Sequence, residues 1–184
     1  MATEFPGFSS PAASTEAPLE MLAACHHRIE RQCSTLKRLA PHLRRHGSDE
    51  QARVAATAIM RYFDTSAIQH HADEEVDLFP ALIESMAGSD AVCIRELTDG
   101  LSADHRKLEA GWRRLRQTLS RISEGQPALL PDEDIDAFVG LYERHMKLEE
   151  DELLPMAARL LGDDAIDQIG RAMRKRRGIA DDLL

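Results

Sequence analysis

The chain has 184 residues, of which 43% are hydrophobic and 30% charged, and its formal net charge is −9. This composition is typical of a soluble globular protein, and the length suffices for one domain with a full hydrophobic core. The acidic balance argues against nucleic acid as the main partner, and the absence of long apolar runs argues against a membrane span.

The cysteines and the N-terminus indicate a compartment. Cys25, Cys33 and Cys93 are odd in number and show no paired spacing, so we expect no disulfide framework and a reducing environment. The first residues lack the basic region and the apolar run of a signal peptide. The sequence therefore predicts a cytoplasmic protein.

The sequence predicts a disordered N-terminal segment followed by two helices in the first half of the chain. Residues 1–18 contain several Pro, Ser and Ala and no apolar run. Apolar residues then recur at helical spacing, which predicts a first helix over about 19–43. Gly47 should end it, and Asp49 offers a cap for a second helix over about 49–86.

The C-terminal half predicts two further long helices and a short one. We expect the third helix over about 90–123 and, after a loop, a fourth that is capped by Asp132 and ends near 161. A short fifth helix should end near 177. Four long helices with short connections favour an all-α, antiparallel up-and-down four-helix bundle over 19–161, with an additional short C-terminal helix and tail over 162–184.

One pattern occurs twice, beginning at His70 and at His145. Each histidine is followed by glutamates four and five residues on, by an acid at seven, a leucine at eight and a proline at ten. These prolines, Pro80 and Pro155, should kink or interrupt their helices just beyond the histidine and glutamate positions, unless they mark plain helix ends.

Helix geometry places each histidine and its first glutamate on one face. Residues four apart differ by about 40° in azimuth, so His70 projects beside Glu74, and His145 beside Glu149. A phenylalanine lies seven residues before each histidine, so this face is otherwise apolar and should point into the bundle. The second glutamates are about 140° from the histidines and should mostly face water.

The first and third helices carry a related pattern. His26 and His105 are each preceded by a leucine at four residues and followed by one at ten, and this register selects His26 over His27. His71 could replace His70, but its counterpart is Met146, which cannot ligate iron in the same way.

Four histidines and two carboxylates from four helices could hold two divalent metal ions. Burying these groups without partners would cost several kcal/mol. In this arrangement each metal receives two imidazole nitrogens and one oxygen from each of Glu74 and Glu149, which bridge. Imidazole with carboxylate suits iron, manganese or zinc.

The two halves, His26 with His70-x-x-x-Glu74 and His105 with His145-x-x-x-Glu149, together with Leu78-Phe79-Pro80, resemble the hemerythrin-like HHE cation-binding family. The resemblance covers about residues 19–161. It implies a four-helix bundle around a non-haem di-iron centre that is oxo- or hydroxo-bridged and interacts with dioxygen. It also implies the metal ligands, which are His26, His70, Glu74, His105, His145 and Glu149.

The chain departs from the family's oxygen carriers at one position. Those proteins place two histidines four apart on the third helix, whereas here Leu101 precedes His105. The missing imidazole argues against reversible dioxygen storage, and a more open iron favours sensing, peroxide or nitric oxide chemistry, or iron handling. Oxygen or redox sensing, or iron handling, is the leading hypothesis. The alternative is a di-iron oxidoreductase acting on peroxide or nitric oxide. The expected small ligand is therefore dioxygen, another diatomic molecule or peroxide, and we expect a sensor to need a partner protein.

Several other residues have plainer interpretations. Asp77 and Glu152 should be solvated bundle-end residues rather than additional ligands, and Trp112 and Tyr142 should pack in the core. The basic cluster over 171–177 should complement the helix dipole at a C-terminal end. Apolar residues of the fifth helix could serve a partner or a homodimer, or pack on the bundle itself; they are Ile166, Ile169 and Met173.

Overall fold

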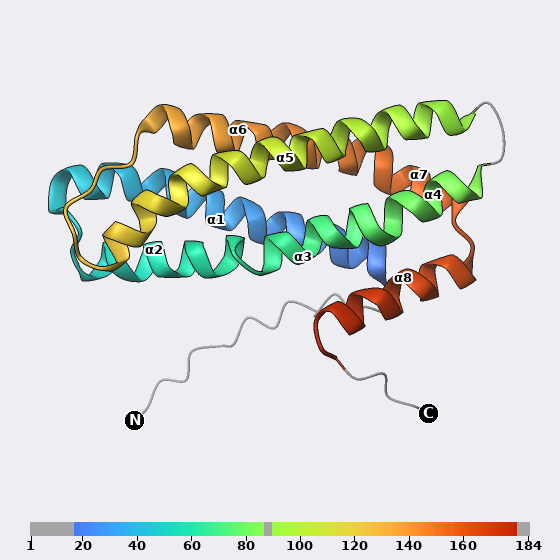
Figure 1. The fold of residues 1–184 in the computed structure, drawn as a ribbon, viewed down its shortest axis with the longest axis horizontal. Coiled ribbons are helices and arrows are strands. Elements are labelled where there is room, and N and C mark those ends of the chain that lie inside the picture. Colours follow the sequence, from blue (N-terminus) through green and yellow to red (C-terminus); the bar gives the residue numbers. More distant parts are fainter. Residues whose placement is uncertain (1–16, 87–89, 180–184) are drawn as a thin grey trace, which may run out of the picture.

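The computed structural model describes residues 17–86 and 90–179. All regular elements in these two ranges are helical, which confirms the predicted all-α class (Figure 1). The disordered N-terminal segment predicted over 1–18 lies outside the described residues except for its last two. The helices are α1 (Pro18–His46), α2 (Glu50–Phe63), α3 (Ser66–Ala72), η1 (Asp73–Leu78), α4 (Phe79–Ser85), α5 (Asp90–Ser123), α6 (Asp132–Leu148), η2 (Glu149–Leu153), α7 (Leu154–Leu160) and α8 (Asp163–Arg176).

The long helices pack around a shared interior. Helix α1 contacts α2 and α6, and α5 contacts the same two helices (Figure 1). These contacts are those of a helical bundle, and the antiparallel up-and-down order remains a prediction. Helix α8 lies at one side of the bundle, where it contacts η1 and α1 (Figure 1).

The predicted first turn is confirmed. Gly47 has a φ of 65°, in the left-handed region that favours glycine, and its N–H donates to the Leu43 carbonyl at 2.9 Å. The Asp49 side chain accepts a hydrogen bond from the Ala52 N–H at 2.9 Å, which caps α2. Asp132, in contrast, does not cap α6. It is the first residue of that helix and forms an ion pair with Arg44 at 2.9 Å.

The predicted second and fourth helices are each interrupted. The second helix breaks at Asp64 and Thr65, between α2 and α3. Both predicted helices then widen into a π-helix, η1 or η2, which ends two residues before the repeated proline. Pro80 and Pro155 become the second residues of α4 and α7, where the missing N–H is tolerated. The expected irregularities take the form of π-helices between each histidine and its proline, and both helices continue past the proline, so neither proline marks a helix end.

The buried apolar side chains form two clusters. One contains Ile29, Leu36, Ile59, Leu115 and Phe138, among others, and the second contains Leu22, Leu78, Leu101, Leu153 and Met173, among others. The first cluster begins after His26 along α1, and the second ends before it. Each is therefore on its own side of the layer in which the histidines lie.

Helix α8 is held to the bundle by apolar packing and by ion pairs. Ile169 and Met173 are buried in the second cluster, so on α8 these apolar residues pack on the bundle itself. Arg176 and Arg177 both form ion pairs with Asp73 of η1, whose side chain is 0% exposed. Arg176 also contacts Asp77 at 2.6 Å. The expectations of a solvated Asp77 and of a purely dipolar role for the basic cluster are therefore wrong for these residues.

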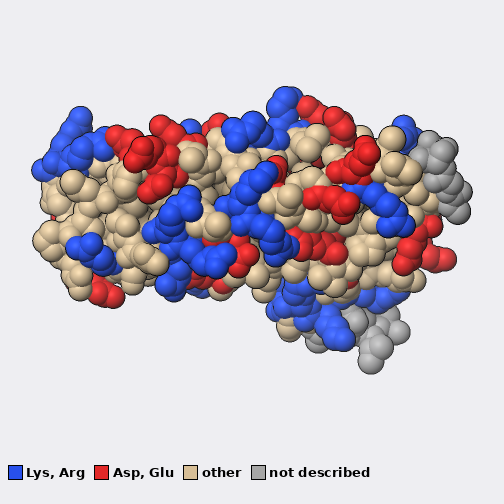
Figure 2. Space-filling view, turned by 45° about the horizontal axis from the view of Figure 1, so that its top comes forward, with Lys and Arg blue, Asp and Glu red and all other residues tan. Residues whose placement is uncertain are grey.

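The charge of the surface and the character of the helices can be compared with two expectations from the sequence, which were no nucleic-acid partner and no membrane span. On the face shown in Figure 2, Lys and Arg side chains are interspersed with Asp and Glu rather than joined into one basic surface. Across residues 17–86 and 90–179, no helix has both the length and the apolar character that crossing a bilayer requires.

The double replacement of Arg176 and Arg177 by Met should lower the free energy of unfolding by about 3 kcal/mol, because it leaves the Asp73 carboxylate buried without a cation. Adding Asp73→Asn to this variant should restore part of the loss. Denaturant unfolding measures both effects. The exposed Arg171→Met is the matched control, and a loss equal to that of the double variant would contradict the role of the buried pair.

Candidate metal centre

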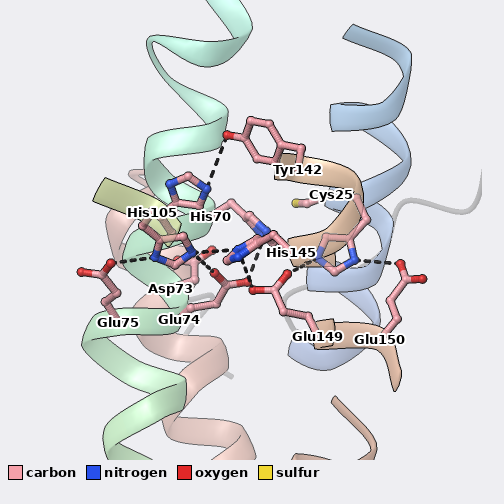
Figure 3. Close-up of polar contacts among 12 residues, drawn as sticks. Cys25, His70, Asp73, Glu74, Glu75, His105, Tyr142, His145, Glu149 and Glu150 are labelled. Carbon is pink, nitrogen blue, oxygen red and sulfur yellow. Dashed lines mark hydrogen bonds and ion pairs between the residues drawn. The ribbon is translucent and has the colours of Figure 1, made fainter. Parts of the chain in front are cut away.

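The structure brings all six residues of the expected ligand set together in one buried cluster. Each is at most 2% exposed, although each carries an ionisable side chain: His26, His70, Glu74, His105, His145 and Glu149. They come from α1, α3, η1, α5, α6 and η2, so each of the four predicted long helices contributes. Figure 3 labels all six residues except His26.

The two carboxylates divide their oxygens between the two halves of the cluster. Glu74 Oε1 lies 3.2 Å from His70 Nε2, and Glu74 Oε2 lies 3.2 Å from His105 Nε2. Glu149 does the same. Its Oε1 lies 3.0 Å from His145 Nε2, and its Oε2 lies 3.1 Å from His26 Nε2.

The result is two sets of four ligand atoms. One set joins His26 and His70 with an oxygen from each carboxylate, and the other joins His105 and His145 with the remaining oxygens. Within each set the atoms lie within 4.8 Å of one another. All four imidazoles present Nε2 to this centre, and His105 Nε2 lies 3.0 Å from His145 Nε2.

Several atoms of the cluster are buried without a hydrogen-bond partner. They are His26 Nε2, His70 Nδ1 and Nε2, Glu74 Oε2, His145 Nδ1 and both carboxylate oxygens of Glu149. Such orphaned atoms are costly, since each has lost its water. Two ligands about 2.1 Å from a shared metal and about 90° apart lie about 3 Å from each other, which matches the distances in the cluster. The donor set therefore fits divalent metal ions.

Each π-helix contains one of the two carboxylates, with η1 beginning at Asp73 and η2 at Glu149. The N–H of Phe79 bonds to the Glu74 carbonyl, and the N–H of Leu154 bonds to the Glu149 carbonyl, each five residues back. A π-turn holds more residues than an α-turn, so it advances by fewer degrees per residue. Consecutive glutamates therefore point less far apart than α-helical geometry predicts.

This local widening corrects the expectation for the second glutamates. Glu75 and Glu150 do not simply face water. Glu75 Oε1 lies 2.6 Å from His105 Nδ1, and Glu150 Oε1 lies 2.8 Å from His26 Nδ1 (Figure 3). Their side chains are 25% and 48% exposed, so each reaches the cluster from its edge. A carboxylate on the far nitrogen fixes the tautomer and orientation of a metal-binding imidazole.

The signal for these two residues was present in the repeat. Both copies of the pattern contain a glutamate doublet, and a purely solvated residue has no reason to recur at the same place in two half-sites. The expectation that these two residues face water assumed a regular α-helix, and the spacing of apolar residues does not reveal the π-turn.

Burial and neighbouring charge move the pKa values of the cluster in opposite directions. Burial alone would lower the pKa of His26, but hydrogen bonds to Glu149 and Glu150 and the charges of Glu149 and Glu74 outweigh it and raise that pKa to about 9. Burial lowers the pKa of His70 to about 3. For the carboxyl of Glu74, burial and the nearby Glu149 raise the pKa well above its usual value.

The remaining histidines lie outside the six-residue cluster. His27 is 79% exposed, and His42 pairs with Asp49 at 2.9 Å. His71 lies beside the cluster, stacked on His105 with ring centroids 4.0 Å apart, and its Nε2 is 3.5 Å from the Tyr142 hydroxyl. Tyr142 and Trp112 are buried in the first apolar cluster, as expected for core residues.

Comparison with known proteins agrees with this geometry. Residues 17–157 match the hemerythrin HHE cation-binding domain. The chain belongs to this family. A protein of Haemophilus influenzae, named only as uncharacterised, is similar over 167 residues with 32% identity, covering 91% of this chain and 94% of that protein. The family resemblance drawn from the repeated pattern is therefore confirmed.

Metal affinity should fall as the pH drops from about 9 to about 7. The pKa of His26 is raised to about 9, so its imidazole is protonated at neutral pH and must lose that proton before Nε2 can donate to a cation. Affinity should change by about tenfold per pH unit for each proton released. Competition with a chelator across this range measures it, and a pH-independent affinity would refute the expectation.

Glu75→Gln and Glu150→Gln should each weaken metal binding by about 10- to 100-fold, because a neutral amide orients and polarises the imidazole less well than a carboxylate. Metal titration against a competing chelator provides the measurement. Glu152→Gln is the matched control, since Glu152 is an exposed acid in η2. Equal effects in the control would mean that only overall charge matters.

Proposed function

We propose that this hemerythrin-family protein binds two metal ions, iron in the cell, and uses them for oxygen or redox sensing or for iron handling. The division of the two carboxylates carries the proposal. Each glutamate offers one oxygen to each histidine pair, which is the arrangement that two neighbouring cations require. Imidazole and carboxylate also accept manganese or zinc, so supply would decide which ion is bound.

The residues that would hold the ions have separate roles. His26 and His70 would bind one ion, His105 and His145 would bind the other, and Glu74 and Glu149 would bridge them. Glu75 and Glu150 would orient His105 and His26 from the outside. Bound iron would supply one-electron redox chemistry and sites for a small ligand such as dioxygen, peroxide or nitric oxide.

The surroundings of His105 support a role other than reversible oxygen storage. Leu101 is fully buried in the second apolar cluster and offers no donor atom. The two histidine pairs therefore supply equal numbers of ligands. Equal, incomplete ligand sets favour reaction with or exchange of small ligands at either ion over storage at one of them.

An enzymatic role is the alternative, and one observation favours it. A cavity of about 450 Å³ reaches His105 and Glu75 from the surface between α3 and α5. Peroxide or nitric oxide could reach the cluster along this route and be turned over. We also propose a cytoplasmic location and either a protein partner or a homodimer. The small ligand would be dioxygen, another diatomic molecule or peroxide.

Protein purified from its host should contain about two iron ions per chain. His70→Ala and Glu149→Ala should lower that number and reduce thermal stability, since metal binding is linked to folding. Elemental analysis and thermal unfolding measure the two effects. His27→Ala is the matched control, because His27 is exposed. Unchanged metal content in both ligand variants would contradict the assignment.

Sensing and enzymatic turnover predict different responses to an oxidant. Reduced, iron-loaded protein should show one stoichiometric change in its visible spectrum when air or peroxide is added, with no continued consumption. Sustained peroxide or nitric oxide consumption over many equivalents would instead support the oxidoreductase. An oxygen electrode or a peroxide assay alongside the spectrum separates the two.

A further inference from the structure

The cavity of about 450 Å³ that reaches His105 is larger than a diatomic ligand requires. It lies between α2, α3 and α5. A cavity of about 150 Å³ already holds a benzene molecule, so this one has room for an aromatic ring with a short side chain. Its size falls in the range of small-molecule binding sites.

The walls of the cavity are mainly apolar and aromatic. Phe63, Leu108, Trp112 and Tyr142 line it, and all four are buried. Aromatic side chains favour an aromatic occupant, because rings stack edge to face or with an offset. At the inner end, His71 and His105 provide the polar surface.

The lining of the cavity contains three acids and three arginines, but the ion pairs use only two of these arginines. Each acid that lines it has an arginine partner there. Glu75 and Glu109 pair with Arg106, and Asp64 pairs with Arg116 at 2.9 Å. The third arginine of the lining, Arg113, is exposed and forms no ion pair with an acid among residues 17–86 and 90–179.

We propose that this cavity binds a small aromatic carboxylate, with its ring against Trp112 and its carboxylate on Arg113. A guanidinium can hold a carboxylate through two parallel hydrogen bonds, which fixes the orientation of the ligand. The ring then fills the route to His105, so the ligand would also control access to the cluster. The binding itself rests on the cavity and Arg113, and it does not depend on the metal.

The chain provides its own reporter for the test. Trp112 is its one tryptophan and lies in the cavity wall. Titrating the purified full-length protein with 3-phenylpropanoate should change Trp112 fluorescence in a saturable way and produce heat in calorimetry. The neutral 3-phenylpropanamide should bind about tenfold more weakly, because it lacks the charge that Arg113 recognises.

A pair of neighbouring arginines separates specific from general attraction. Arg113→Gln should weaken binding of the acid by about tenfold and leave binding of the amide unchanged. Arg114→Gln is the matched control, because Arg114 is an exposed neighbour on α5 that does not line the cavity. Calorimetry gives both affinities for each variant.

Three results would overturn the proposal. They are no saturable response to the acid up to about 10 mM, equal affinities for acid and amide, and equal losses in the two arginine variants. Failure of these tests with intact reactivity toward peroxide would identify the cavity as a passage for small ligands only. The metal-based function would then stand without the aromatic site.

Discussion

The structure depends on burying six ionisable side chains in a layer between two apolar clusters. Four imidazoles and two carboxylates lie there, and most of their inward atoms find no hydrogen-bond partner in the protein. Leaving such groups unsatisfied is expensive, and replacing them with apolar residues would cost less. Their arrangement is understandable if cations complete it, because the lone pairs of His26, Glu74 and the others then bind metal instead of water.

The π-helices explain how two adjacent glutamates of one helix can both contact the histidine cluster. A regular α-helix would point consecutive glutamates about 100° apart and lose one of them to solvent. The widened turns at Glu74 and Glu149 keep the first glutamate at the centre and allow the second to reach a histidine of another helix. The following prolines suit this geometry, since an amide without N–H does not need a bond to the preceding turn.

The cluster differs in its surroundings on its two sides. On one side, α8 fixes η1 through Arg176, Arg177 and the buried Asp73, which directly precedes Glu74 in the chain. The second π-helix has no such partner at the equivalent position, because Leu148 precedes Glu149. On the other side, the aromatic cavity approaches His105. The internal repeat is therefore symmetric at the six clustered residues and asymmetric in the residues around them. These surrounding residues are where access to the cluster can be controlled.

The sequence by itself determined the all-α class, the family and the six clustered residues. The duplicated spacing of His70 with Glu74 and of His145 with Glu149 requires only the periodicity of a helix, so local pattern was sufficient. Tertiary structure decided what that periodicity does not contain. Contacts between segments far apart in the chain decided four features: the break at Asp64, the inward reach of Glu75 and Glu150, the pairing of Asp73 with α8, and the cavity beside Trp112. The inward reach of the two glutamates also depends on the π-turns, which the spacing of apolar residues does not reveal.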